Sequence, residues 1–330
     1  MTDTEVKVDH LVCDDCGLCA SVCPTGAIQY ERFGDLGFVT WIDRVNLEKD
    51  CTVVIGNERA LHRLWWKSQG NRFANTVFME HPNWNALSLM QILYVFSKGA
   101  ARLVLLQQKG RGQSVLTSQA QAANQIIQAL FSMKDFVQMF STEEALENLK
   151  LQAHSPLPYP WEQQGGLRTR RPFLCSILSF LLEASNKEAF ISSSSGADSF
   201  GELECDPGLC TQCLSCINEC RAGALEANEA MFCLTFLASA CVQCGICTKL
   251  CPENALVSRP GLYLQKSFFK RRILTKAEPA RCARCGKVFG TRASLEKVKS
   301  ILGQRQDLDV KLFDYCEDCR VKLLFEKQGG

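Results

Sequence analysis

Apolar and polar positions follow two alternating patterns in the middle of the chain. Short apolar runs, typical of buried strands, are each followed by a segment with the three-to-four-residue spacing of an amphipathic helix. Four strand–helix pairs are predicted: TVVI (52–55) with 58–69, TVFME (76–80) with 86–98, ARLVLLQ (101–107) with 117–131, and FVQMF (136–140) with 142–153. Because strands alternate with helices, we predict an α/β domain with a parallel sheet over 51–153.

Two of these helices carry more specific signals. Ser141 and Glu144 have the spacing of a capping box at the start of the last helix. On the first helix, Leu61 and Leu64 mark an apolar stripe, and we predict that Trp65 and Trp66 are packed in the core with it.

Cysteine changes this picture, because the 330 residues contain 20 cysteines and sixteen of them are clustered. Three runs repeat the spacing C-x2-C-x2-C-x3-C: CDDCGLCASVCPTGAI (13–28), CTQCLSCINECRAGAL (210–225) and CVQCGICTKLCPENAL (241–256). Clustering of this kind indicates metal sites rather than disulfides. A loop with this spacing places three thiolates around one [4Fe–4S] cube, and the fourth thiolate comes from elsewhere in the chain.

The second and third runs form a complete pair. Residues 205–258, within a predicted domain of 205–262, resemble the bacterial two-cluster ferredoxins, in which the last cysteine of each run ligates the other cluster. The resemblance implies an α+β ferredoxin-like module with two clusters. One would be held by Cys210, Cys213, Cys216 and Cys251, and the other by Cys241, Cys244, Cys247 and Cys220.

The first run has no partner run nearby, so residues 1–50 read as half of a ferredoxin. Cys13, Cys16 and Cys19 are expected to hold a third cluster. Cys51 follows Cys19 by 32 residues, close to the 35 between Cys216 and Cys251, which makes it a candidate fourth ligand. Cys23 itself, a three-iron cluster and a ligand from a partner are the alternatives. On the Cys51 interpretation, GFVTWID (37–43) would be the remaining ferredoxin strand.

The last segment, 263–330, carries two C-x2-C pairs with a helical pattern over 291–305 between them. Cys282, Cys285, Cys316 and Cys319 resemble the ligands of treble-clef or ribbon zinc sites, and four thiolates indicate a structural Zn²⁺. A rubredoxin-like iron site is the alternative. The basic stretch KSFFKRRILTK (266–276) is expected to be a solvated linker.

Residues 154–204 are rich in proline, glycine and serine and are predicted to be a linker with a short helix near 173–184. The isolated cysteines Cys175, Cys205 and Cys233 are expected to be buried and inert. GRGQS (110–114) is expected to be a plain turn between a strand and a helix, because it lacks the pattern of a phosphate-binding loop.

The window 77–130 is similar to the delta subunit of methyl-viologen-reducing hydrogenase at the step Lys98-Gly99-Ala100-Ala101-Arg102. The family's cluster cysteines are missing from this window. The resemblance implies a docking platform in a redox complex with a heterodisulfide reductase.

These observations predict a cytoplasmic polyferredoxin that transfers single electrons. The expected partner is a molybdenum or tungsten oxidoreductase, a hydrogenase or a heterodisulfide-reductase-type complex. The net charge of +2 makes nucleic acid an unlikely partner, and no secretory signal or membrane span is expected. Two alternatives stay open: a reductase that binds flavin or nucleotide at GRGQS, and a metal-dependent assembly or regulatory protein.

Overall fold

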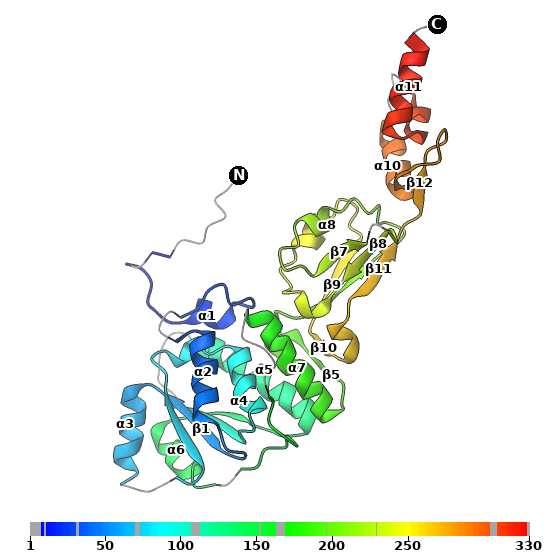
Figure 1. The fold of residues 1–330 in the computed structure, drawn as a ribbon. Coiled ribbons are helices and arrows are strands. Elements are labelled where there is room, and N and C mark those ends of the chain that lie inside the picture. The colour runs from blue at the N-terminus through cyan, green and yellow to red at the C-terminus, as the bar shows by residue number, and fades with distance from the viewer. Residues whose placement is uncertain are drawn as a thin grey trace. The chain divides into compact units, whose positions relative to one another are not determined.

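The computed structural model divides the chain into two compact units (Figure 1). The first comprises residues 1–199 together with Gly261–Lys266, and the second comprises Phe200–Pro260 together with residues 267–330. Within them, the structure describes residues 8–9, 11–30, 33–69, 73–106, 113–151, 153–162, 169–195, 197–228, 230–303 and 309–328. The first three residues of the GRGQS turn lie outside these ranges.

The core of the first unit is a parallel sheet of four strands in the order β2-β1-β3-β4. The strands are β1 (Thr52–Gly56), β2 (Thr76–Glu80), β3 (Arg102–Leu106) and β4 (Val137–Phe140). Every residue of the two central strands β1 and β3 is buried, as expected when helices cover both faces of a parallel sheet. The predicted α/β domain is confirmed strand by strand.

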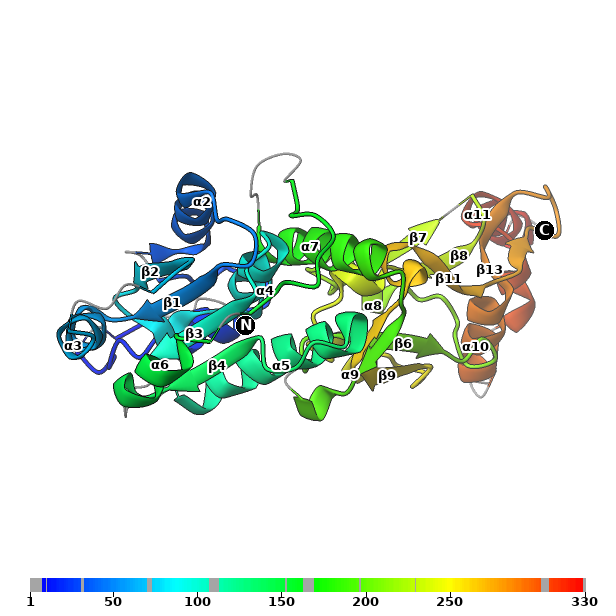
Figure 2. The ribbon, with the colours of Figure 1, turned by 90° about the horizontal axis from the view of Figure 1, so that it is seen from below.

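Helices cover the two faces of this sheet (Figure 2). On one face α3 (Glu58–Lys67) contacts α6 (Thr142–Asn148), and on the other α4 (Leu89–Ser97) contacts α5 (Gln113–Phe131) and α7 (Arg170–Ser185). The capping box of Ser141 and Glu144 is present at the start of α6. A two-stranded sheet of β5 (Ala189–Ile191) and β10 (Leu262–Leu264) completes the unit.

Three expectations for the first unit are wrong. GFVTWID lies in a helix, α2 (Asp35–Val45), whose buried Phe38, Val39 and Ile42 have helical spacing. Trp65 and Trp66 are 63% and 64% exposed, because the buried side of α3 is formed by Ala60 and Leu64. The helix expected within a linker is α7, which is largely buried on α4 and α5.

The second unit begins with the segment that carries the paired cysteine runs. It contains a three-stranded antiparallel sheet of β7 (Leu225–Asn228), β8 (Cys233–Phe236) and β11 (Arg272–Lys276), and a two-stranded sheet of β6 (Gly201–Cys205) and β9 (Leu256–Pro260). Two single-turn helices, α8 (Ser215–Asn218) and α9 (Ile246–Lys249), lie in the cysteine runs.

The rest of the second unit carries the two C-x2-C pairs. It contains the hairpin β12 (Pro279–Arg281) and β13 (Val288–Thr291), then α10 (Arg292–Leu302) and α11 (Glu317–Gln328). The stretch 266–276 is not a linker, since Phe268 is buried and β11 pairs with β8. Among the described residues of both units, no helix is long and apolar enough to cross a membrane.

Candidate iron–sulfur and metal sites

The three cysteine runs fold with the same backbone. In each run, the residue before the second cysteine and the residue after it have positive φ. These residues are Asp15 (51°), Gln212 (54°) and Gln243 (54°), followed by Gly17 (75°), Leu214 (65°) and Gly245 (71°). Left-handed conformations are unfavourable for non-glycine residues, so their recurrence at matched positions identifies one loop built three times.

The turn after the fourth cysteine is also shared. The backbone N–H three residues on donates to the carbonyl oxygen of that cysteine in all three runs. The donors are Gly26 (3.3 Å), Gly223 (3.0 Å) and Asn254 (3.2 Å), all with positive φ. The first run therefore shares the cysteine loop and the turn after it with both runs of the complete pair, although it lies in a different unit of the chain.

In the second unit, the structure brings together the four cysteines predicted for one cluster. Cys210, Cys213, Cys216 and Cys251 line a single cavity, with Leu234 and Leu256 providing apolar walls. Burial, reinforced by the charges of the neighbouring cysteines Cys210, Cys247, Cys213 and Cys251, raises the pKa of Cys216 to about 12. Four converging thiols in a partly apolar cavity fit the donor set of a [4Fe–4S] cluster.

In the second set of four, the other three cysteines lie close enough to Cys247 for their charges to affect it. Burial and then the charges of Cys241, Cys220 and Cys244 raise the pKa of Cys247 to about 11. Cys220 comes from the other run, as the crossed arrangement requires, and the assignment of this second set to one cluster stays a prediction. Iron binding would replace the protons that hold these crowded sulfurs neutral.

Several of these sulfurs have hydrogen-bond donors beside them. The backbone N–H of Ala255 donates to Cys251 Sγ at 3.3 Å, and the side-chain amide of Gln243 donates to Cys241 Sγ at 3.5 Å. Cys205, expected to be buried and inert, is half-exposed, and a hydrogen bond to Cys210 raises the pKa of Cys205. The same contact lowers the pKa of Cys210 to about 6. The expectation for Cys205 is wrong because the end of β6 lies beside the cluster loop.

The first run packs on the α/β domain instead of on a second ferredoxin half. Its helix α1 (Leu18–Val22) contacts the 3-10 helix Trp84–Ala86, which follows β2. A Cβ at Gly17 would lie 2.8 Å from Ala86 Cβ, so glycine is needed for this approach. Ser21 Oγ donates to the carbonyl of Leu87 at 2.6 Å.

A buried arginine from α7 fixes the end of α1. Arg170 is 4% exposed and pairs with Asp35, 1% exposed, through two hydrogen bonds of 2.8 and 2.9 Å. Its Nη1 also donates to the carbonyls of Ala20 (2.5 Å) and Cys23 (2.8 Å), which lie at the C-terminal end of α1. Sequence reasoning missed this residue, because nothing local marks an arginine 147 positions from its acceptor.

Cys51 does not join the first run. It is 1% exposed at the start of β1, where its carbonyl accepts from Ala101 N–H at 2.9 Å. The run packs beyond the opposite, carboxyl end of the sheet, against residues that follow β2. Five residues of strand separate these edges, about 15 Å. Burial raises the pKa of Cys51 to about 11, as it does for the cluster cysteines Cys216 and Cys247, so the position of Cys51 and not its pKa separates it from the first run.

Cys23 is followed by the same turn as the two cross-ligating cysteines, and its sulfur lies 3.6 Å from the Thr25 hydroxyl. Burial opposes ionisation of this thiol. Hydrogen bonds from Ile28 N–H and the Thr25 hydroxyl, with others from the same turn, outweigh burial and lower the pKa of Cys23. The turn thus stabilises a thiolate here, although the ligand role of Cys23 stays a prediction.

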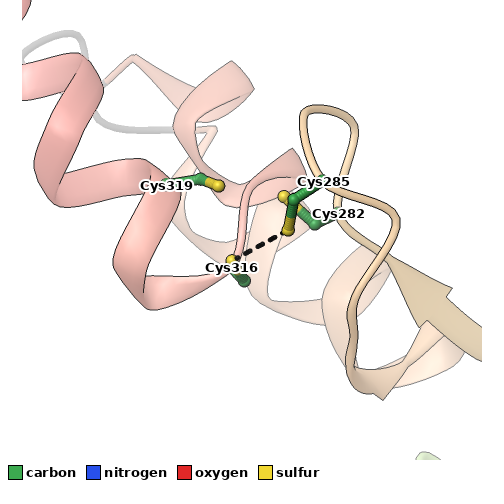
Figure 3. A group of neighbouring side chains, drawn as sticks. All are labelled: Cys282, Cys285, Cys316 and Cys319. Atoms are coloured by element: carbon green, nitrogen blue, oxygen red, sulfur yellow. Dashed lines mark hydrogen bonds between the residues drawn. The ribbon is translucent and has the colours of Figure 1, made fainter.

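The four cysteines of the C-terminal segment converge (Figure 3). The sulfurs of Cys282, Cys285, Cys316 and Cys319 all lie within 4.8 Å of one another, and Cys285 and Cys316 are 3.6 Å apart. Gly286, with φ of 74°, donates its N–H to the Cys282 carbonyl at 2.9 Å, as expected for a tight turn after the first pair. This compact group could hold one metal ion.

Each of the three runs matches a protein-family model. Residues 6–29 and 234–257 match a 4Fe-4S binding domain, and residues 207–223 match a second 4Fe-4S binding domain model. No curated protein matches the chain. The matches contain all twelve cysteines of the three runs and support a ferredoxin-type protein with iron–sulfur clusters.

Proposed function

We propose that this chain, with its three 4Fe-4S binding segments, is an electron-transfer protein that passes single electrons to or from a partner oxidoreductase. The observation that carries the proposal is the cavity of the second unit, which is lined by Cys210, Cys213 and Cys216 of one run and by Cys251 of the other. Clusters held there would transfer single electrons, a function that needs no substrate pocket. The protein would hold the clusters, limit their contact with water and tune their potentials through hydrogen bonds to sulfur.

We further propose that the first run holds a third cluster, with Cys13, Cys16 and Cys19 as ligands and Cys23 as the fourth. The shared backbone of the three runs supports Cys13, Cys16 and Cys19 as ligands. Cys23 is proposed as the fourth because its turn stabilises a thiolate and because Cys51 lies at the other edge of the sheet, although the matched cysteines Cys220 and Cys251 are expected to ligate the cluster of the other run. With the run seated on it, the α/β domain would serve as a docking platform for a redox complex. Partners of the molybdenum, tungsten, hydrogenase or heterodisulfide-reductase type belong to this proposal.

For the C-terminal four-cysteine group we propose a structural Zn²⁺. Four thiolates around one point leave no open position for a substrate, which is the usual arrangement of a structural zinc site. The cytoplasm, where thiolates persist, is the proposed location.

The proposal is tested by anaerobic purification with iron, zinc and sulfide analysis and EPR spectroscopy of the reduced protein. We expect about twelve iron and about one zinc per chain, from three cubes and one four-cysteine site. A content of about eight iron per chain would show that the first run holds no cluster. An absence of cluster signals would overturn the proposed function. A flavin absorbance would favour a reductase instead.

A further inference from the structure

The side chain of Gln243 is held against one cluster ligand. Gln243 lies between Cys241 and Cys244, and its Nε2 donates to Cys241 Sγ at 3.5 Å. Its Oε1 accepts a hydrogen bond from the Ser258 hydroxyl on β9. Because the hydroxyl is bound to the oxygen end of the amide, the NH₂ end faces the sulfur.

The fold leaves a space of the right size for this amide. Gly201, the first residue of β6, lies so close that a Cβ there would be 2.3 Å from Gln243 Nε2 and 2.4 Å from its Cδ. Every other side chain at position 201 would displace the donor. The strands β6 and β9, which pair with each other, therefore fix the amide from two sides.

The matched residues of the other two runs do not make this contact. Asp15 has a carboxylate, which accepts from the Tyr30 hydroxyl at 3.1 Å and cannot donate. Gln212 has the same side chain and nearly the same backbone as Gln243, but its Nε2 donates to the Phe232 carbonyl at 2.9 Å. Gln212 is thus an internal control for the effect of a glutamine at this position.

We propose that Gln243 is a positioning residue that raises the reduction potential of the cluster held by Cys241, Cys244, Cys247 and Cys220. The inference rests on the proposed binding of [4Fe–4S] clusters by this pair. A hydrogen bond to a ligand sulfur withdraws negative charge from the cluster. The reduced state, which carries one more electron, is stabilised more than the oxidised state.

The experiment is an EPR-monitored redox titration of the full chain, with iron analysis of each preparation. Gln243→Met keeps the length of the side chain and removes the donor. We expect iron to be retained and one midpoint potential to become more negative, with the others unchanged. Ser258→Ala removes only the group that orients the amide, so it should move the same midpoint in the same direction by less. The control Gln212→Met should leave the midpoint that Gln243→Met moves in place.

The outcomes separate this inference from the proposed function. If Gln243→Met retains its iron and all midpoints stay where they are in the wild type, the inference is wrong and the electron-transfer function stands. If Gln243→Met loses iron, Ser258→Ala decides, and an unchanged midpoint there overturns the inference. If the wild-type protein holds no clusters, the proposed function itself is wrong. Gln243→Asn, which keeps an amide donor, should recover part of the lost potential.

Discussion

At the scale of single residues, the two candidate fourth ligands of the first cluster are separated by the parallel sheet. Cys51 lies at its amino edge, and Cys23 lies in the run beyond its carboxyl edge. We therefore expect Cys51→Ser to retain the wild-type iron content and Cys23→Ser to lose about four iron per chain. Cys19→Ser is the positive control for loss of the cluster. Full iron in Cys23→Ser would mean that the run takes its fourth ligand from elsewhere.

The buried pair of Arg170 and Asp35 gives a second prediction. Arg170→Met leaves Asp35 charged and without its partner in the interior, which costs about 3–5 kcal/mol of unfolding free energy. All five tryptophans belong to the first unit, so urea unfolding followed by tryptophan fluorescence reports this unit alone.

The matched control for Arg170 is Lys150→Ala. Lys150 and its partner Glu147 are 57% and 76% exposed, and removing this pair should cost about 0.5 kcal/mol or less. Equal effects of the two substitutions would contradict a structural role for the buried arginine.

At the scale of elements, the seating of α1 on the α/β domain depends on one close approach. Gly17→Ala requires an unfavourable left-handed alanine, at about 1–2 kcal/mol, and also places a methyl group 2.8 Å from Ala86 Cβ. The double variant Gly17→Ala/Ala86→Gly removes the contact with Ala86 Cβ, while the Cα and N of residue 86 stay 3.0 Å from the added methyl group. Unfolding of the single and double variants, followed by tryptophan fluorescence, should show a favourable coupling energy of about 1 kcal/mol or more.

Gly245 offers the comparison in the third run, where the same φ occurs without crowding. An added Cβ there has its nearest neighbour, Thr248 Oγ1, at 4.0 Å. Gly245→Ala should therefore show only the conformational cost, measured by unfolding followed by circular dichroism, because the tryptophans do not report the second unit. Additive effects in the Gly17–Ala86 cycle would argue against the close contact.

Local patterns predicted elements well and their orientation less well. The four strands and their helices follow from periodicity, because buried parallel strands are short apolar runs. The strand predicted at GFVTWID comes from the analogy with a ferredoxin closed by Cys51. It is wrong because Phe38, Val39 and Ile42 lie on one face of a helix. The prediction that Trp65 and Trp66 are buried is wrong because successive side chains of a helix point in directions about 100° apart. The residues that follow the buried Leu64 therefore face outward.

At the scale of the whole molecule, the cysteine sites could be predicted because their ligands are close in sequence. The crossed pair and the C-terminal group both follow from fixed spacing. The Arg170 contacts, the position of Cys51 and the space at Gly201 depend on residues brought together only by the complete fold. No local signal in the sequence encodes them.

The metals of the chain should be separable by mutation. Cys285→Ser removes one ligand of the C-terminal group, and we expect loss of the single zinc with iron unchanged, measured by elemental analysis. Cys175→Ala, at a buried cysteine of α7, is the control that should keep both metals. Loss of one iron in place of zinc would identify a rubredoxin-like site.

The first unit is interrupted in sequence, since the two paired cysteine runs lie between β5 and its partner strand β10. The unit can therefore be completed only after both runs have been synthesised. On the ribosome, the paired runs at 210–251 can assemble from neighbouring residues as they emerge. The first cluster run emerges earliest, yet it must wait for Arg170, and its unit closes only at Leu262–Leu264. We therefore expect the clusters to be inserted in an order that differs from the order of their cysteines, with the N-terminal site exposed to oxygen for longest during biogenesis.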